Sequence, residues 1–367
     1  MATKSKIMER SFRLGAGRYI QEDGAARRLG EELTRLRRKK PLILHGKRAL
    51  AEAGEKIEAG LAEQGINGIY VEYTEFCNPD RCQAILASEE AEGCDCIVGV
   101  GGGNVCDASK LCAVMANLPV ITVPTSSATC AAYTPLSVCY NDIGQTIGTR
   151  HHDREVNCVL ADMEILCRQP VRLLVAGIYD SAAKLVETRQ RLEGKTEDEI
   201  DIGLRSSFVL SEFIYDRLLS DLPRVCDDVA HGRNTKAVYD TVYIILSVTG
   251  VISGLARGSN QCAIAHKIYE TTRTLYPREA RSYLHGELVA MGLITQLIYN
   301  GEPEKAEEFK AQMHALGMPV CLSEAGLTVT EDTFRAYTDK LEHSSALDGV
   351  SDRELECFRA AFRVICN

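Results

Sequence analysis

The sequence lacks any uninterrupted apolar stretch approaching the about 18 to 20 residues that span a membrane. Its first ten residues also lack the apolar core of a secretory signal peptide. These two absences predict a cytoplasmic protein. Positive charge is scarce as well, since 42 basic residues stand against 51 acidic ones, which argues against nucleic acid or a membrane as a partner. The expected partner is therefore a small molecule.

The chain has no low-complexity tract and no internal repeat. With 45% hydrophobic and 25% charged residues, its composition is that of a globular protein. A length of 367 residues exceeds what one hydrophobic core usually serves, so we expect two domains. We also expect the chain to form a homo-oligomer.

The fifteen cysteines do not form a recognisable zinc-binding pattern. Cys77 and Cys82 lie close together in sequence, as do Cys94 and Cys96, but neither pair has a matching second pair at zinc-ligand spacing. Most of the others lie within apolar patterns. They are therefore interpreted as small buried hydrophobic residues in a reducing compartment.

A glycine-rich stretch follows the apolar run at residues 96–100. Gly101, Gly102 and Gly103 are followed by a helical pattern that begins at Asn104, and a second apolar run occupies residues 118–123. Strand, glycine turn, helix and strand form the layout that binds a pyrophosphate, because glycines admit the phosphates and the helix N-terminus offers free N–H groups. An ordinary tight turn between a strand and a helix is the alternative.

Strand and helix patterns alternate from residue 40 to residue 125, which predicts an α/β domain with a parallel sheet. After residue 162 only helical periodicity is found. We therefore predict a dinucleotide-binding domain at residues 1–165 and an all-α metal-binding, catalytic domain at residues 166–367. The cleft between two such domains is the expected active site.

Only eight histidines are present, so their positions are informative. His266 lies on an apolar helix, His285 begins another, and Asp180 lies within a third. Two imidazoles and a carboxylate suit catalytic Zn²⁺ or Fe²⁺, and a buried carboxylate is costly unless it is paired or coordinated. Their spacing matches no short metal motif, so ordinary core residues remain the alternative. His151 and His152 form a rival pair in a polar segment, where solvated side chains are expected.

No nucleophile elbow and no Walker lysine occurs in the sequence. Ser126 and Ser127 follow an apolar run, where they favour a contact with phosphate. Cys130 is a candidate thiol nucleophile, but no basic residue lies between Lys110 and Arg150 to lower its pKa.

Five segments, in this order, resemble the iron-containing (group III) alcohol dehydrogenases on the glycerol dehydrogenase branch. Residues 101–110 match the cofactor turn Gly-Gly-Gly-x-x-x-Asp-x-x-Lys, and residues 123–125 begin a second phosphate loop. Residues 170–180 and 263–266 match two metal-binding helices, and 284–287 match the third metal-binding segment. The resemblance implies a Rossmann-like N-terminal domain and a helical C-terminal domain, the dehydroquinate synthase-like fold.

The resemblance also implies a ligand for each site. Asp180, His266 and His285 would bind one divalent metal, Zn²⁺ or Fe²⁺. A nicotinamide dinucleotide, NAD or NADP, would be contacted by Gly46, Lys47, Gly101, Gly102, Gly103, Asn104, Val105, Asp107, Thr125, Thr134, Leu136 and Tyr140.

Two departures from the family concern substrate and cofactor. Glycerol dehydrogenases have an aspartate at the position of Cys130, and here the loop is similar to that of hydroxycarboxylate dehydrogenases, which reduce 2-oxo acids. A thiol does not repel an anionic substrate. At Gly46, relatives that prefer NAD have an aspartate that excludes a 2′-phosphate, and Lys47 and Arg48 could attract that phosphate.

Two further departures lie beside the metal motifs. Tyr269 occupies the position of a histidine that is credited in the family with passing a proton to solvent, so it is a candidate catalytic residue. Tyr179 stands where a glycine is usual, and it is expected to narrow the pocket.

Together these features predict a metal-dependent NAD(P)(H) oxidoreductase that acts on a small 2-hydroxy acid/2-oxo acid pair or a related alcohol. The alternatives are a glycerol or polyol dehydrogenase, a dehydroquinate synthase-type lyase and a non-catalytic nucleotide-binding protein. The lyase would need several basic residues around the metal, and the sequence offers four candidates: Lys267, Arg273, Arg278 and Arg281.

Overall fold

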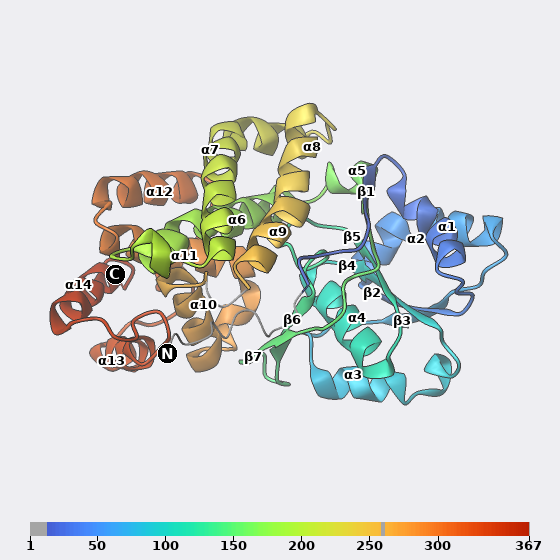
Figure 1. Cartoon of the computed structure of the whole chain (residues 1–367), viewed down its shortest axis with the longest axis horizontal. Helices are drawn as coiled ribbons and strands as arrows, with labels where there is room; N and C mark the ends of the chain where they lie inside the picture. The colour runs from blue at the N-terminus through green and yellow to red at the C-terminus, as the bar shows by residue number, and fades with distance from the viewer. Residues whose placement is uncertain (1–12, 258–260, 367) are drawn as a thin grey trace.

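The computed structural model describes residues 13–257 and 261–366. A parallel sheet with helices on both faces forms one half of the molecule, and packed helices form the other (Figure 1). The predicted fold class is therefore confirmed. The domain boundary at residue 165 stays a prediction.

Six strands form the main sheet in the order β1-β8-β5-β4-β2-β3, and every neighbouring pair is parallel. Their bounds are β1 Tyr19–Glu22, β2 Pro41–His45, β3 Ile69–Glu72, β4 Cys96–Gly101, β5 Val120–Pro124 and β8 Cys158–Asp162. Because all six strands run the same way, the loops that follow β2, β4 and β5 lie at one edge of the sheet, where ligands bind in such folds.

Helices cover both faces of this sheet (Figure 1). Successive side chains of a strand point to opposite faces, so Ile43 and Val98 pack with α1 (Leu29–Arg35) and α2 (Lys47–Glu63). Leu42 and Ile97 pack on the other face, with α3 (Pro79–Leu86) and α4 (Gly103–Ala116). Short 3-10 helices complete this half: η1 Ala25–Arg28 and η2 Glu89–Ala91.

An antiparallel hairpin, β6 (Leu136–Tyr140) and β7 (Thr146–His151), lies between β5 and β8 in the chain, and the sequence analysis did not predict it. Its turn is held by Asn141, whose side chain accepts hydrogen bonds from the N–H groups of Ile143 and Gln145. Most of β7 is exposed, so the strand shows little hydrophobic alternation in its sequence.

The other half contains helices only, within the described residues after β8. They are α5 Met163–Leu166, α6 Val171–Leu192, η3 Glu197–Glu199, α7 Ile202–Ala230, α8 Lys236–Tyr243, the π-helical η4 Ile244–Val248, α9 Thr249–Leu255, α10 Ile264–Leu275, η5 Glu279–Ser282, α11 His285–Tyr299, α12 Pro303–Ala315, α13 Glu331–Glu342 and α14 Asp352–Arg363. Their apolar faces form one large core.

Glycines let α6, α11 and the loop after β5 approach closely enough to bring distant residues together. A Cβ on Gly286 of α11 would lie 2.0 Å from the carbonyl oxygen of Ala176 in α6. A Cβ on Gly177 of α6 would lie 1.9 Å from the carbonyl oxygen of Ser127. Helix α6 therefore packs directly on α11 and on the loop after β5, with no room for larger side chains.

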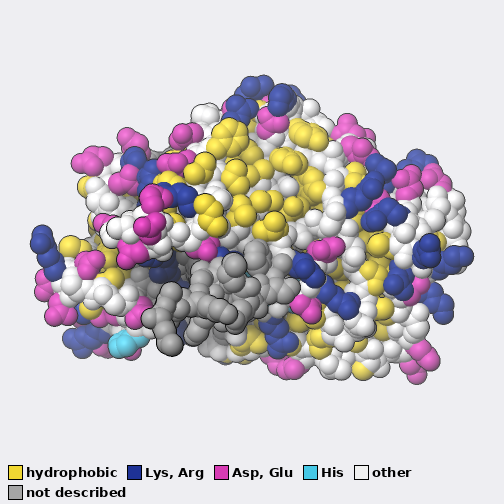
Figure 2. Space-filling view, viewed as in Figure 1, with side chains coloured by type: hydrophobic (Ala, Val, Ile, Leu, Met, Phe, Trp, Pro, Cys, Tyr) yellow, Lys and Arg dark blue, Asp and Glu magenta, His cyan; other side chains and the backbone are white. Residues whose placement is uncertain are grey.

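The continuous helical stretch Lys236–Leu255 is long and apolar enough to cross a membrane by length and composition alone. Its best window is 61% buried within the protein, and core helices of soluble proteins meet the same criterion. Beside it, hydrophobic side chains gather on one face over α7 and α8 (Figure 2). The most exposed of them are Ile202, Val209, Phe213, Tyr239 and Tyr243.

Candidate metal and dinucleotide site

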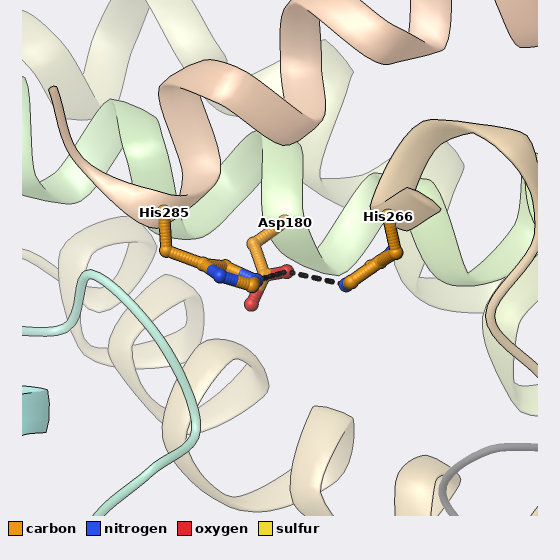
Figure 3. A group of neighbouring side chains, drawn as sticks. All are labelled: Asp180, His266 and His285. Carbon is orange, nitrogen blue, oxygen red and sulfur yellow. Dashed lines mark ion pairs between the residues drawn. The ribbon is translucent and has the colours of Figure 1, made fainter. Parts of the chain in front are cut away.

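Asp180, His266 and His285 lie together although they are far apart in sequence. Asp180 is in the middle of α6, His266 is in the first turn of α10, and His285 is the first residue of α11. The two imidazoles approach the carboxylate from opposite sides (Figure 3). Oδ1 of Asp180 lies 3.4 Å from Nε2 of His266 and 3.2 Å from Nε2 of His285.

This arrangement fits a divalent cation. Oδ1 of Asp180 is buried and has no hydrogen-bond partner among the described residues. Burial alone would raise the pKa of Asp180, but Lys184 and the two imidazoles together hold it well below its ordinary value. An ionised, buried carboxylate facing two imidazole nitrogens is the donor set of a catalytic Zn²⁺ or Fe²⁺ centre.

The imidazole of His266 is oriented by Glu187, which lies two helical turns after Asp180. Oε2 of Glu187 is 2.5 Å from Nδ1 of His266, while Oε1 accepts the backbone N–H groups of Ala263 and His266. A carboxylate on Nδ1 leaves Nε2 free to bind a metal and fixes the ring. The sequence analysis missed this residue, although its spacing from Asp180 places both on one helix face.

His285 is held by the start of α11. Glu287 accepts the backbone N–H of Leu284 at 2.8 Å and forms an ion pair with Arg172 of α6. The helix terminus that carries His285 is therefore tied to the helix that carries Asp180.

The glycine turn lies at the carboxyl edge of the parallel sheet. Gly101 ends β4, Gly102 precedes α4, and Gly103 is its first residue. The N–H of Thr125, after β5, donates to the carbonyl of Gly101. Gly46 follows β2 at the same edge, and Lys47, exposed to solvent, begins α2. Gly46 is tied to β4 by its N–H, which donates to the carbonyl of Val100, and the N-terminus of α4 has no side-chain cap. That these residues bind a pyrophosphate stays a prediction.

Other predicted cofactor residues already have partners inside the protein. Val105 packs on Gly101, and Asp107 accepts the backbone N–H of Val138 through Oδ2. The hydroxyl of Thr134 donates to the carbonyl of Cys130, and the carbonyl of Leu136 accepts a hydrogen bond from Lys110. These contacts shape the loop and hairpin next to the turn, and a direct contact of these four residues with the cofactor stays a prediction.

Tyr140 of β6 joins the two halves of the site. Its hydroxyl lies 2.5 Å from the hydroxyl of Tyr269 on α10. The ring of Tyr269 meets the ring of His285 edge-on, with centroids 4.2 Å apart. Burial raises the pKa of both tyrosines, so both hydroxyls keep their protons at neutral pH.

Residues 16–163 match the family of iron-containing alcohol dehydrogenases. Over 89% of its length the chain is 29% identical to hydroxycarboxylate dehydrogenase A of Escherichia coli, of which it covers 88%. It is also 29% identical to glycerol dehydrogenase of Thermotoga maritima, over 86% of this chain and 85% of that one. Residues 16–163 therefore match a domain of the iron-containing alcohol dehydrogenase family, and the sequence relatives extend the similarity into the helical half.

Solved structures agree with this assignment at the level of fold. Glycerol dehydrogenase of Schizosaccharomyces pombe superposes with a TM-score of 0.80 at 21% identity, over 97% of this chain and 91% of that one. A probable glycerol dehydrogenase of Sinorhizobium meliloti gives 0.79 at 22% identity, over 96% of each chain. The solved structures therefore show the fold. The sequence relatives, which are named hydroxycarboxylate and glycerol dehydrogenases, support a dehydrogenase.

In this dehydrogenase, Cys130 lies in the loop that packs against α6. Burial raises the pKa of its thiol to about 11, although the nearby ammonium of Lys184 acts in the opposite direction. The thiol is therefore neutral at physiological pH and is not an activated nucleophile. The sequence showed no cation near Cys130, because Lys184 reaches it only through the tertiary fold.

Lys184 is the second residue of the site that the sequence analysis missed, since only later basic residues were considered. It lies one helical turn after Asp180 on α6 and is 6% exposed. A useful signal was present: the charged residues Asp180, Lys184 and Glu187 share one face of an otherwise apolar helix.

Two predictions about this dehydrogenase are wrong. Tyr179 does not narrow the pocket, because its ring lies in the helical core, with its edge against Phe309 and its hydroxyl bonded to Gln312. His152 is not a solvated loop residue: it is buried, and its Nε2 lies 2.9 Å from the hydroxyl of Ser137. The adjacent His151 is exposed, as expected.

Proposed function

We propose that this dehydrogenase transfers a hydride between a nicotinamide dinucleotide and a small 2-hydroxy acid/2-oxo acid pair. The observation that supports this substrate class is the neutral thiol of Cys130, which faces the ammonium of Lys184 near the candidate metal residues. The carboxylates of Asp180 and Glu187 are directed at the imidazoles, and the positive charges of Lys184 and of a bound divalent metal would exceed their two negative charges.

Family membership implies a nicotinamide dinucleotide and a divalent metal. We propose that Asp180, His266 and His285 hold the metal and that the turn at Gly101–Gly103 holds the pyrophosphate. When bound, these groups provide Lewis-acid polarisation of the substrate oxygen and the hydride itself. Glu187 keeps His266 in the correct tautomer and orientation.

We propose that the proton of the alcohol passes through the hydrogen bond between Tyr269 and Tyr140. The two hydroxyls are protonated and hydrogen-bonded to each other, and the ring of Tyr269 lies against the ring of His285, so a proton could pass from one hydroxyl to the other. Replacing Tyr269 by phenylalanine should lower kcat about tenfold at neutral pH with little change in metal content. An unchanged kcat would leave the relay to water.

We propose that NADP is accepted as well as NAD. Gly46 has no carboxylate to repel a 2′-phosphate, and Lys47 and Arg48 begin α2 with exposed cationic side chains. Comparing KM for NADPH and NADH, in the wild type and in Gly46→Asp, tests this. The aspartate should raise KM for NADPH alone.

Oxidation of glycerol or another polyol is the second candidate, since relatives named glycerol dehydrogenase match as well as the hydroxycarboxylate enzyme does. A substrate panel separates the two. Oxidation of NADH and NADPH would be followed with 2-oxobutanoate, 2-oxoglutarate and dihydroxyacetone, using protein loaded with Zn²⁺ or Fe²⁺. We expect the oxo acids to give the larger kcat/KM and chelation to abolish turnover. A larger value with dihydroxyacetone would select the polyol function.

We also propose a homo-oligomer in the cytoplasm. Contiguous exposed apolar side chains on α7 and α8 favour burial against another copy, because monomers rarely expose large apolar patches. All fifteen cysteines are free, which suits a reducing compartment. Sedimentation velocity of the wild type and of Phe213→Glu tests the association, and cell fractionation tests the location.

A further inference from the structure

Lys184 is a buried cation without a hydrogen-bond partner among the residues that the structure describes. Its side chain is 6% exposed, and its Nζ makes no hydrogen bond and no ion pair with any residue that the structure describes. Taking an ammonium out of water is costly unless another charge or several hydrogen bonds compensate it. Asp180 and Glu187 stabilise the charge of Lys184 through space, but no described group accepts a hydrogen bond from its Nζ. A buried ammonium whose protons are not accepted points to a ligand that accepts them.

The charges around Lys184 leave room for one more anion. Asp180 and Glu187 lie on the same helix face, and each is already directed at an imidazole. Metal ligation requires neutral imidazoles. A divalent metal and Lys184 would then carry three positive charges, and the two carboxylates carry two negative charges. One positive charge is left without a counter-charge. The pocket therefore matches a substrate with a single negative charge.

The loop after β5 does not provide that charge. It touches α6 directly, since Gly177 leaves no space between the helix and the carbonyl of Ser127. The residue that it brings near Lys184 is Cys130, whose buried thiol stays protonated at neutral pH. A neutral thiol leaves the ammonium free to bind an anion from the cleft.

We propose that Lys184 binds the carboxylate of a 2-oxo acid substrate and so selects acids over neutral ketones. Residues one helical turn apart lie on the same helix face, with their Cβ atoms roughly 5–6 Å apart. Lys184 and Asp180 can therefore lie near the two ends of a substrate whose carboxylate and 2-oxo group are on neighbouring carbons. A charge-assisted hydrogen bond from Nζ to the carboxylate would hold the 2-oxo group towards Asp180, His266 and His285. This inference rests on the proposed 2-oxo acid function.

A matched pair of substrates isolates the carboxylate. In 1-hydroxybutan-2-one, a hydroxymethyl group replaces the carboxylate of 2-oxobutanoate. For Lys184→Met we expect KM for 2-oxobutanoate to rise at least about thirtyfold and KM for the neutral ketone to stay within about threefold. Lys184→Arg should keep much of the preference for the acid, because it keeps the charge. Lys195→Met, at an exposed position just beyond α6, is the control and should change neither KM.

A binding measurement without turnover completes the test. Oxalate resembles a 2-oxo acid because it has a carboxylate next to a second carbon that carries oxygen. It would be titrated calorimetrically into the zinc-loaded wild type and into zinc-loaded Lys184→Met, and the zinc content of each protein would be measured. We expect at least about thirtyfold weaker oxalate binding at equal zinc content. If Lys184→Met does not fold, Lys184→Gln replaces it with the same expectations.

The outcomes separate the two proposals. A wild type that reduces 2-oxobutanoate while Lys184→Met keeps its KM and its oxalate affinity overturns the role of Lys184 alone. An equal rise in KM for both substrates, or loss of zinc in the variant, also overturns this role. Either result would mean that Lys184 positions the metal ligand Asp180 and does not bind the substrate carboxylate. A wild type that reduces no 2-oxo acid overturns the proposed function itself.

Discussion

Among the described residues, two lysines are buried, one in each half of the site, and their surroundings differ. Lys110 of α4 is 2% exposed and donates to the carbonyls of Ala131, Thr134 and Leu136. It also forms an ion pair with Asp107 at 2.8 Å. Lys184 of α6 is nearly as buried, yet it has no such partner within the described residues. One buried lysine is therefore satisfied by groups of the protein, and the other keeps its hydrogen-bond donors unused.

The backbone around each lysine explains the difference. Lys110 faces the loop after β5 and the first residue of β6, whose carbonyls accept its protons. Lys184 lies on a helix whose own carbonyls are bonded within the helix. Lys110 thus holds the loop of Cys130 in place, while Lys184 remains available to a ligand.

Replacing Asp180 by asparagine should give the largest effect, and this effect should be a loss of activity with little change in stability. Removal of the anionic metal ligand is expected to lower kcat/KM by at least about a thousandfold, with zinc content reduced. The free energy of unfolding of the metal-free protein should change by no more than about 1 kcal/mol, because a carboxylate without hydrogen bonds to Oδ1 is not a structural anchor. Kinetics, metal analysis and urea titration check this. A strongly destabilised variant would contradict this, because it would show that Asp180 stabilises the fold, as Lys110 is expected to do.

Lys110→Met should lower stability the most. Its loss leaves Asp107 and three carbonyls buried without their donor, at an expected cost of about 3–5 kcal/mol in the free energy of unfolding. Lys184→Met should cost at least about 2 kcal/mol less, since it leaves no hydrogen-bonded group without its donor. Urea unfolding of the two metal-free variants measures both values. Equal costs would remove the distinction between the two lysines.

Cys130→Asp should make the surroundings of Lys184 resemble those of Lys110. The new carboxylate would pair with the ammonium, repel an anionic substrate and accept hydrogen bonds from polyol hydroxyls. We expect the ratio of glycerol to 2-hydroxybutanoate activity to rise at least about tenfold. Cys130→Ser is the control, because it adds polarity without charge. An unchanged ratio would show that Cys130 does not select the substrate.

His152→Asn should have the smallest effect. We expect it to change only the pH dependence of stability, through the surroundings of Lys110. Burial, followed by the charge of Lys110, lowers the pKa of His152 to about 4, against an ordinary value of 6.5. Between these values the unfolded chain binds more protons than the folded one, so stability falls as the pH drops from 6.5 towards 4. The wild type should lose about 1 kcal/mol more than the variant between pH 7 and pH 5. Parallel pH dependences would contradict this.

The sequence alone was sufficient for the parts of the protein that depend on local pattern. The alternation of strands and helices predicted the parallel sheet, and the glycines after residue 100 predicted the turn at its carboxyl edge. The hairpin β6–β7 was not predicted, because its outer strand is exposed and has no apolar alternation. Its position depends on distant groups, including the bond from Val138 to Asp107.

Local periodicity therefore predicted the fold class. The cofactor turn and the set Asp180, His266 and His285 were selected by the resemblance to a known family, because residue type and spacing left ordinary alternatives open. Only the tertiary structure decided which groups meet them. It brought Glu187 to His266, placed the ring of Tyr179 in the core and brought Lys184 to Cys130 across 54 positions of sequence. The reason is physical: the charge of a buried group depends on its neighbours in space, and those are set by the packing of α6 against the loop after β5.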